Sequence, residues 1–105
     1  MELNIVVGDY SMNLNLPQAF LDSSRESFDR LDRSMDQGIQ LGQEWVAEPD
    51  QHQRCQAAAD RLLTALETHN EGLAMLSAGY IVSRMPGVKR VWIDNGGEPG
   101  ENRFE

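Results

Sequence analysis

The first sixteen residues alternate apolar and polar side chains with a period of two, which is the pattern of β-strands that bury one face. Two alternating runs, 3–7 and 10–16, flank Gly8-Asp9. A two-residue type II′ turn needs a positive φ at its first central position, and glycine adopts it without strain. The sequence therefore predicts a β-hairpin. The register that gathers its large apolar side chains on one face pairs Val7 with Tyr10, Ile5 with Met12 and Leu3 with Leu14.

A long amphipathic helix is predicted after the hairpin. Apolar residues recur through residues 21–45 at spacings of three, four or six to seven, and charged residues occupy the opposite face. The helix either starts at Pro17, a residue suited to a first helical turn, or breaks and restarts at Ser23, where Ser23-Ser24-Arg25-Glu26 matches a capping box. It ends before Pro49, because proline disfavours helical geometry in the residue before it.

Two more helical patterns follow, at about residues 50–67 and 71–85. Thr68 and Glu71 match a capping box, so we expect a break or kink there, although one uninterrupted helix would also suit the shared apolar stripe. The second pattern is apolar almost all round, which is typical of a helix buried on most sides. Pro86-Gly87 stops it, and the alternation that resumes over 88–94 predicts a third strand.

These elements predict an α+β fold in which a small antiparallel sheet, made of the N-terminal hairpin and the C-terminal strand, packs on two to three helices. We expect residues 1–94 to form a single domain, since a chain of 105 residues is long enough for one core. Residues 95–105 are rich in glycine, proline and glutamate, and they predict a flexible acidic tail.

Composition narrows the classes of function. The formal net charge of −8 argues against binding to nucleic acid or to anionic membranes. The longest apolar stretch, residues 73–82, has about half the length that a bilayer span needs. No basic region opens the chain, so we expect a cytoplasmic protein. A single cysteine excludes an internal disulfide and a multi-cysteine zinc site.

Two glycines interrupt the predicted long helix. Gly38, Gly42 and Trp45 would lie near one another on the same side of this helix. A glycine in a helix interior costs about 1 kcal/mol relative to alanine, so we expect compensation from a second helix that packs closely there, within the chain or across a dimer. The alternative is that the helix ends near Gly38 and that residues 38–47 form a looser turn.

The weak candidates for metal ligands form two groups. His52 and Cys55 lie one helical turn apart, and Glu67, His69 and Glu71 cluster near the end of the same segment. A continuous helix would separate His52 from His69 by about 25 Å, so one ion cannot join both groups within a chain. The favoured interpretation is therefore no metal and no cofactor, with Cys55 as a small buried apolar side chain and both histidines facing solvent.

Acidic residues recur along one face of the predicted long helix. The Glu-x-x-His pairs of a di-metal bundle are missing, and arginines lie three or four residues from the acids, so the pattern predicts a solvated salt-bridge ladder. No motif for a nucleophile or a phosphate loop is present, and we predict no catalytic residue. The acids are Asp22, Glu26, Asp29, Asp32 and Asp36.

Arg90 and Trp92 share the outer face of the predicted third strand, and an exposed tryptophan beside arginine is the composition of a contact hot spot. The predicted interaction residues are Gly38, Gly42, Trp45, Arg90 and Trp92. The sequence thus favours a small acidic cytoplasmic protein that acts by protein–protein association, as a homodimer and as an accessory or regulatory partner, without catalysis. Two alternatives are a metal-binding or redox-responsive protein that uses Cys55 and His52, and an acidic inhibitor of a basic partner.

Overall fold

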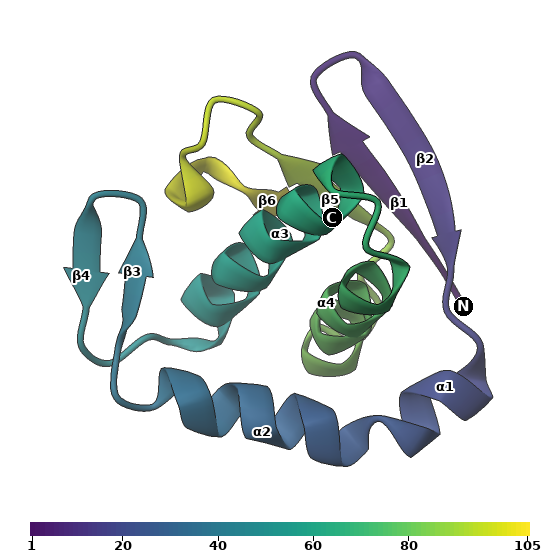
Figure 1. Cartoon of the computed structure of the whole chain (residues 1–105), viewed down its shortest axis with the longest axis horizontal. Coiled ribbons are helices and arrows are strands. Elements are labelled where there is room, and N and C mark those ends of the chain that lie inside the picture. The colour runs from purple at the N-terminus through teal and green to yellow at the C-terminus, as the bar shows by residue number, and fades with distance from the viewer.

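The computed structural model describes all residues, 1–105, as an α+β fold in which helices pack on one face of a four-stranded sheet (Figure 1). The predicted fold class is confirmed. No helix is long and apolar enough to cross a bilayer. Along the chain the elements are β1 (Glu2–Val7), β2 (Tyr10–Asn15), α1 (Gln18–Ser23), α2 (Arg25–Met35), β3 (Ile39–Leu41), β4 (Glu44–Val46), α3 (Gln51–Glu67), α4 (Glu71–Arg84), β5 (Arg90–Ile93), the 3-10 helix η1 (Pro99–Glu101) and β6 (Arg103–Phe104).

The N-terminal hairpin has the predicted register. β1 and β2 are antiparallel, and Val7 lies opposite Tyr10. Gly8 has a φ of 59°, as the first central position of a type II′ turn requires. Leu3 and Ile5 are completely buried, so the apolar face of the hairpin is the face that packs against the helices.

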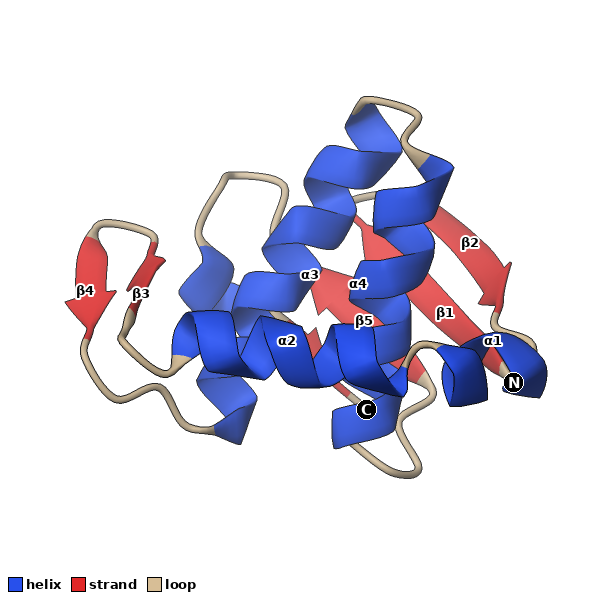
Figure 2. Cartoon of the chain, turned by 60° about the horizontal axis from the view of Figure 1, so that its bottom comes forward, coloured by secondary structure: helices blue, strands red, loops and turns tan.

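The last long strand joins the sheet parallel to β1, which corrects the prediction of an antiparallel sheet. The strand order is β2-β1-β5-β6, and Ile5 is level with Val91. A parallel neighbour needs a crossover connection, and the whole helical layer supplies one between β2 and β5. The chain re-enters the sheet at the end where β1 begins, and there the Asn4 N–H donates to the Lys89 carbonyl at 2.9 Å. Figure 2 shows α3 and α4 in front of β1 and β5.

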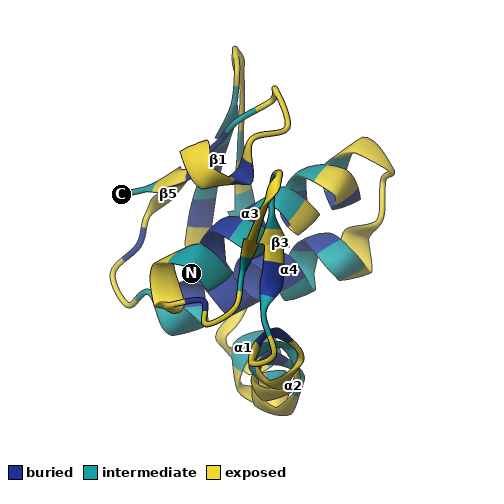
Figure 3. Ribbon diagram, turned by 90° about the vertical axis from the view of Figure 1, so that its left-hand side faces the viewer, coloured by how far each residue is buried: buried dark blue, intermediate teal, exposed yellow.

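The core lies between the sheet and the antiparallel pair α3 and α4 (Figure 3). The predicted break between these helices is confirmed, and it falls at His69, whose φ of 55° turns the chain. Asn70 caps α4 by accepting a hydrogen bond from the Leu73 N–H at 3.1 Å. The prediction that the helix at 71–85 is buried on most sides is also confirmed, since seven residues of α4 are buried and Tyr80 and Ile81 are completely so.

The predicted long helix was wrong beyond Met35, where α2 ends and β3 and β4 form a second hairpin. The alternative of a break near Ser23 is confirmed, since Ser24 separates α1 from α2, although the Ser24 side chain makes no capping hydrogen bond. Gly38 and Gly42 have φ values of 112° and 66°, which no helix interior contains. The alternative of a helix that ends near Gly38 is therefore the correct one. Gly42 begins a two-residue turn between paired Leu41 and Glu44, so it repeats the turn signal of Gly8.

Residues 99–105 pack on the domain, so the prediction of a flexible acidic tail was wrong for the second half of 95–105. β6 pairs with β5, and Pro99 and Asn102 are buried. The Asn102 amide donates to the Gln56 carbonyl at 3.0 Å and accepts from the Asp94 N–H at 2.8 Å. In return, the Gln56 amide donates to the carbonyls of Gly100 and Asn102 at 3.0 and 3.2 Å. These bonds anchor the segment to α3.

Replacing Asn102 with alanine should lower the free energy of unfolding by about 2 kcal/mol, because the buried Gln56 carbonyl and the partly buried Asp94 N–H would each lose the hydrogen bond to the Asn102 side chain. Urea denaturation followed by circular dichroism measures the change. Asn95→Ala is the matched control: Asn95 is exposed, and its replacement should change stability by less than about 0.5 kcal/mol. Equal effects of the two variants would contradict the anchor.

Candidate functional site

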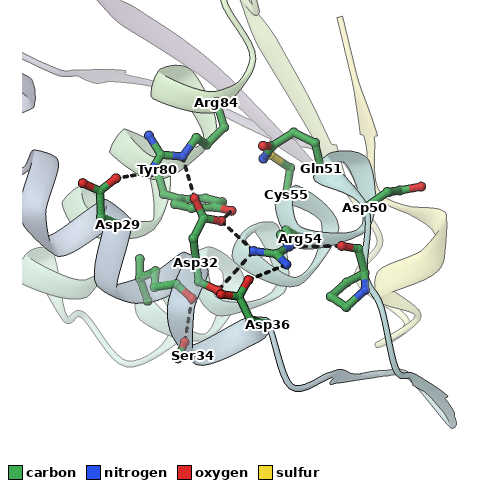
Figure 4. Close-up of polar contacts among 12 residues, drawn as sticks. Asp29, Asp32, Ser34, Asp36, Asp50, Gln51, Arg54, Cys55, Tyr80 and Arg84 are labelled. Atoms are coloured by element: carbon green, nitrogen blue, oxygen red, sulfur yellow. Dashed lines mark hydrogen bonds and ion pairs between the residues drawn. The ribbon is translucent and has the colours of Figure 1, made fainter.

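The most connected polar group of the molecule is the Asp32 carboxylate on α2 (Figure 4). It accepts hydrogen bonds from the Tyr80 hydroxyl at 2.5 Å, Arg84 Nε at 2.9 Å and Arg54 Nη1 at 3.2 Å. Tyr80 and Arg84 belong to α4 and Arg54 belongs to α3, so a single side chain ties α2 to both other helices. About a quarter of the Asp32 side chain, 26 %, is exposed.

The two arginines of this cluster bind further acids of α2. Arg54 Nη2 lies 2.8 Å from Asp36, and Arg84 Nη2 lies 2.8 Å from Asp29. The acidic face of the predicted long helix is thus partnered from α3 and α4, whereas the prediction placed its partners on the helix itself. The only pair at helical spacing is the loose contact of Arg25 with Asp22 at 3.9 Å.

Electrostatics in the cluster favours a charged Asp32 and a neutral Tyr80. Burial alone would raise the pKa of Asp32, but the hydrogen bonds from Tyr80, Arg84 and Arg54 outweigh burial and lower it. Burial and the bond to the Asp32 carboxylate raise the pKa of Tyr80. The Tyr80 hydroxyl and the Arg84 guanidinium therefore keep their protons and donate them to the Asp32 carboxylate. The cluster thus acts as a clamp, a set of side-chain bonds that holds the helices together.

Cys55 lies beside this cluster on α3 and is completely buried. Burial raises the pKa of its thiol to about 11, although the Gln51 amide donates to its sulfur at 3.7 Å. Because the thiolate is the reactive form, we expect Cys55 to react with Ellman's reagent at pH 8 at least about tenfold more slowly in the folded protein than in urea. A single absorbance time course in each condition measures this ratio, and equal rates would contradict the packing of Cys55.

The structure does not join the weak metal candidates. No group of three or more His, Cys, Asp or Glu side chains is placed to hold an ion. His52 is exposed at the start of α3 and meets Phe104 edge to face, with ring centroids 5.6 Å apart. His69 is the positive-φ residue of the α3–α4 turn. Glu67 at the end of α3 and Glu71 at the start of α4 flank it and are exposed, and Cys55 lies near the other end of α3.

Four of the predicted interaction residues form two separate pairs. On the second hairpin, Gly38 leaves room for the Trp45 indole, since a Cβ at Gly38 would lie 2.4 Å from its Cζ2. On the outer face of the large sheet, the guanidinium groups of Arg90 and Arg103 each lie 5.5 Å from the Trp92 ring. Trp45 is 60 % exposed, whereas the two arginines partly cover Trp92. Gly42, the fifth, only turns the second hairpin.

Sequence reasoning missed an apolar groove of about 620 Å³ between the β1–β2 hairpin and the α3–α4 turn. Tyr10, on its hairpin wall, is 60 % exposed. The apolar pattern of the sequence predicts that the lining residues are buried in the core. Only the tertiary structure shows that the end of the core where they lie is left uncovered. The apolar groove is lined chiefly by Val7, Met12 and Leu14 of the hairpin and Leu63, Leu66 and Met75 of the helices.

Comparison with known proteins assigns this chain to no family. No family model matches the chain, and neither a curated protein nor a solved structure matches it. The class of protein is thus defined by the fold and the groove alone: an α+β chain with a mixed sheet, a clamped helical layer and one open apolar end.

Proposed function

We propose that this protein acts by protein–protein association, as a homodimer that serves as an accessory or regulatory partner, without chemistry of its own. The observation that carries the proposal is the apolar groove, whose wall exposes 60 % of Tyr10 to solvent. A contiguous apolar surface rimmed by polar residues typically marks a contact site. The rim here consists of Glu67, His69, Asn70 and Glu71.

Two further features support association over catalysis. The Asp32 cluster commits its carboxylate, hydroxyl and guanidinium groups to bonds between helices. The pKa of Cys55, near 11, disfavours a reactive thiolate, which counts against the redox-responsive alternative. The proposal also includes a cytoplasmic location and no nucleic-acid partner, since a net charge of −8 repels phosphate.

Two matched variants test the proposal by sedimentation velocity and native mass spectrometry at protein concentrations between 1 and 100 μM. Dissociation constants in this range differ by about 3 kcal/mol in the free energy of association. Tyr10 and Trp45 are both aromatic and both 60 % exposed, but only Tyr10 lines the apolar groove. We expect a dimer for the wild type. We also expect at least about tenfold weaker dimerisation in Tyr10→Ser and unchanged dimerisation in Trp45→Ser.

Other outcomes are equally informative. A wild type that stays monomeric over the whole range would contradict self-association. Weakening by Trp45→Ser alone would move the interface from the apolar groove to the β3–β4 hairpin. An added mass that matches a metal ion, and that disappears in Cys55→Ala, would replace the proposal with the metal-binding alternative.

A further inference from the structure

Strand β2 forms one edge of the large sheet, and its outer side has no neighbouring strand. Natural edge strands are usually protected from pairing with another chain by charged side chains, proline or a bulge. β2 has the sequence YSMNLN, which contains no charge and no proline, and all six residues pair with β1 in an unbroken register. The edge is therefore regular and unprotected.

The backbone groups that point outward from this edge follow from the hairpin register. Val7 and Tyr10 flank a two-residue turn, so they form a hydrogen-bonded pair, and the pattern alternates along β2. The hydrogen bond from the Leu16 N–H to the Met1 carbonyl agrees with this alternation, in which the even-numbered residues of β2 bond to β1. Hence the N–H and C=O groups directed away from β1 are those of Ser11, Asn13 and Asn15.

Charge singles out the same region. The chain contains two runs of twelve residues without Asp, Glu, Lys or Arg, 10–21 and 72–83. The second run is most of α4, the buried core helix. The first run comprises β2 and most of α1, and it includes exposed residues throughout β2. Two copies that each carry a net charge of −8 repel one another, and this uncharged run is where they can approach at the lowest electrostatic cost.

We propose that the occupant of this edge is a second copy of the chain, whose β2 pairs antiparallel with the first β2 about a twofold axis at Asn13. This inference rests on the proposed self-association and specifies its geometry. Centring the pairing on Asn13 sets Ser11 opposite the partner's Asn15, so all three outward residues are used and about six hydrogen bonds form. The two four-stranded sheets become one sheet of eight strands.

The side chains fit this register. Met12 lies opposite the partner's Leu14, and both belong to the wall of the apolar groove, so the apolar faces of the two copies become continuous. Asp9, the nearest charged residue in the sequence, lies opposite the partner's Pro17, which is uncharged. Within the two paired strands no like charges face each other, because β2 contains no charged residue.

A matched pair of substitutions at Asn13 tests the proposal. Both Asn13→Pro and Asn13→Thr remove the bond from the Asn4 amide to Asn13 Oδ1, but only proline removes the outward N–H. Because that N–H does not bond to β1, proline is tolerated within the monomer. We expect Asn13→Thr to dimerise as the wild type does and Asn13→Pro to be monomeric up to 100 μM, about a hundredfold loss of affinity or more.

A crosslinking experiment tests the register and does not depend on how Asn13→Pro folds. In a hydrogen-bonded antiparallel pair the Cα atoms lie about 5.5 Å apart, a separation that a disulfide can bridge. Oxidation of Asn13→Cys with copper phenanthroline should therefore give a covalent dimer, whereas Glu26→Cys, on the exposed side of α2, should give none.

The outcomes separate this inference from the proposed function. A dimer that persists in Asn13→Pro, with no crosslink in Asn13→Cys, overturns the β2 pairing and leaves self-association in place. A wild type that is monomeric at 100 μM overturns both. Rapid hydrogen exchange of the Ser11, Asn13 and Asn15 amides in the wild-type dimer would also overturn the pairing, because hydrogen bonds to the partner strand would protect them.

Discussion

Replacing Asp32 with alanine will lower the free energy of unfolding by about 3 kcal/mol, measured by urea denaturation at pH 7. The substitution leaves the Tyr80 hydroxyl, which is buried, and the guanidinium groups of Arg54 and Arg84 without the acceptor they share. Tyr80 is completely buried, so water does not readily replace the lost partner. The loss should therefore exceed that of an ordinary surface ion pair several times over.

A neighbouring acid supplies the control. Asp29 also pairs with Arg84, at 2.8 Å, but 60 % of its side chain is exposed. Asp29→Ala should cost less than about 1 kcal/mol. If Asp29→Ala and Asp32→Ala destabilise the protein equally, the interpretation of Asp32 as the clamp between the three helices is wrong.

The same carboxylate gives the protein an acid-sensitive contribution to stability. The pKa of Asp32 is lower in the folded state than in the unfolded chain, so the unfolded state binds more protons as the pH falls. The contribution is present at neutral pH and is lost below about pH 4, as the pH falls through the folded pKa. Urea denaturation between pH 7 and pH 3 should show a smaller loss of stability in Asp32→Asn than in the wild type.

Replacing Gly79 with leucine will destabilise the protein by at least about 3 kcal/mol or prevent folding. Gly79 is buried in the middle of α4, where Phe20 of α1 and Phe28 of α2 lie against it. A Cβ at this position would lie 2.8 Å from Phe28 Cζ and 3.2 Å from Phe20 Cε2. Phe28 is completely buried, and because protein interiors are close-packed its ring cannot shift without displacing its neighbours.

Alanine substitutions in the same helix separate packing from helix propensity. Gly72 lies in the first turn of α4, and the nearest atom to an added Cβ there is 3.7 Å away. Gly72→Ala should therefore stabilise the protein by up to about 1 kcal/mol, whereas Gly79→Ala should destabilise it despite the same gain in propensity. Thermal and urea denaturation of both variants measure the signs. A stabilising Gly79→Ala would show that α4 is not packed tightly against Phe28.

Features that depend on residues close together in the sequence were predicted well. The register of the first hairpin, the break near His69 and the burial of α4 follow from alternation, caps and apolar content. The error over residues 36–47 arose because the spacing of apolar residues suits a helix as far as Trp45, although the chain forms a hairpin there. The turn signal at Gly42, flanked by the alternation of β3, could have identified the second hairpin.

The candidate site could be predicted only in part. The acidic face of α2 and the arginines were visible in the sequence, but their pairing across helices was not. The apolar groove draws on side chains of β1, β2, α3 and α4, and its apolar lining residues do not differ in type from ordinary core residues. Gly38, Gly42 and Trp45 were predicted to make contacts because they share one side of a helix that does not form, and the structure places them in or beside the β3–β4 hairpin. Arg90 and Trp92 were chosen for exposure and composition, and they lie on β5.

The amino-acid sequence by itself determined the elements that local geometry dictates: the strands on either side of Gly8, the helices α3 and α4, and the turn between them. The tertiary structure alone decided the parallel pairing of β5, the anchoring of Asn102 and the opening of the apolar groove. The physical reason is distance along the chain. Gln56 and Asn102 lie 46 positions apart, and no local periodicity records which buried group will find which partner.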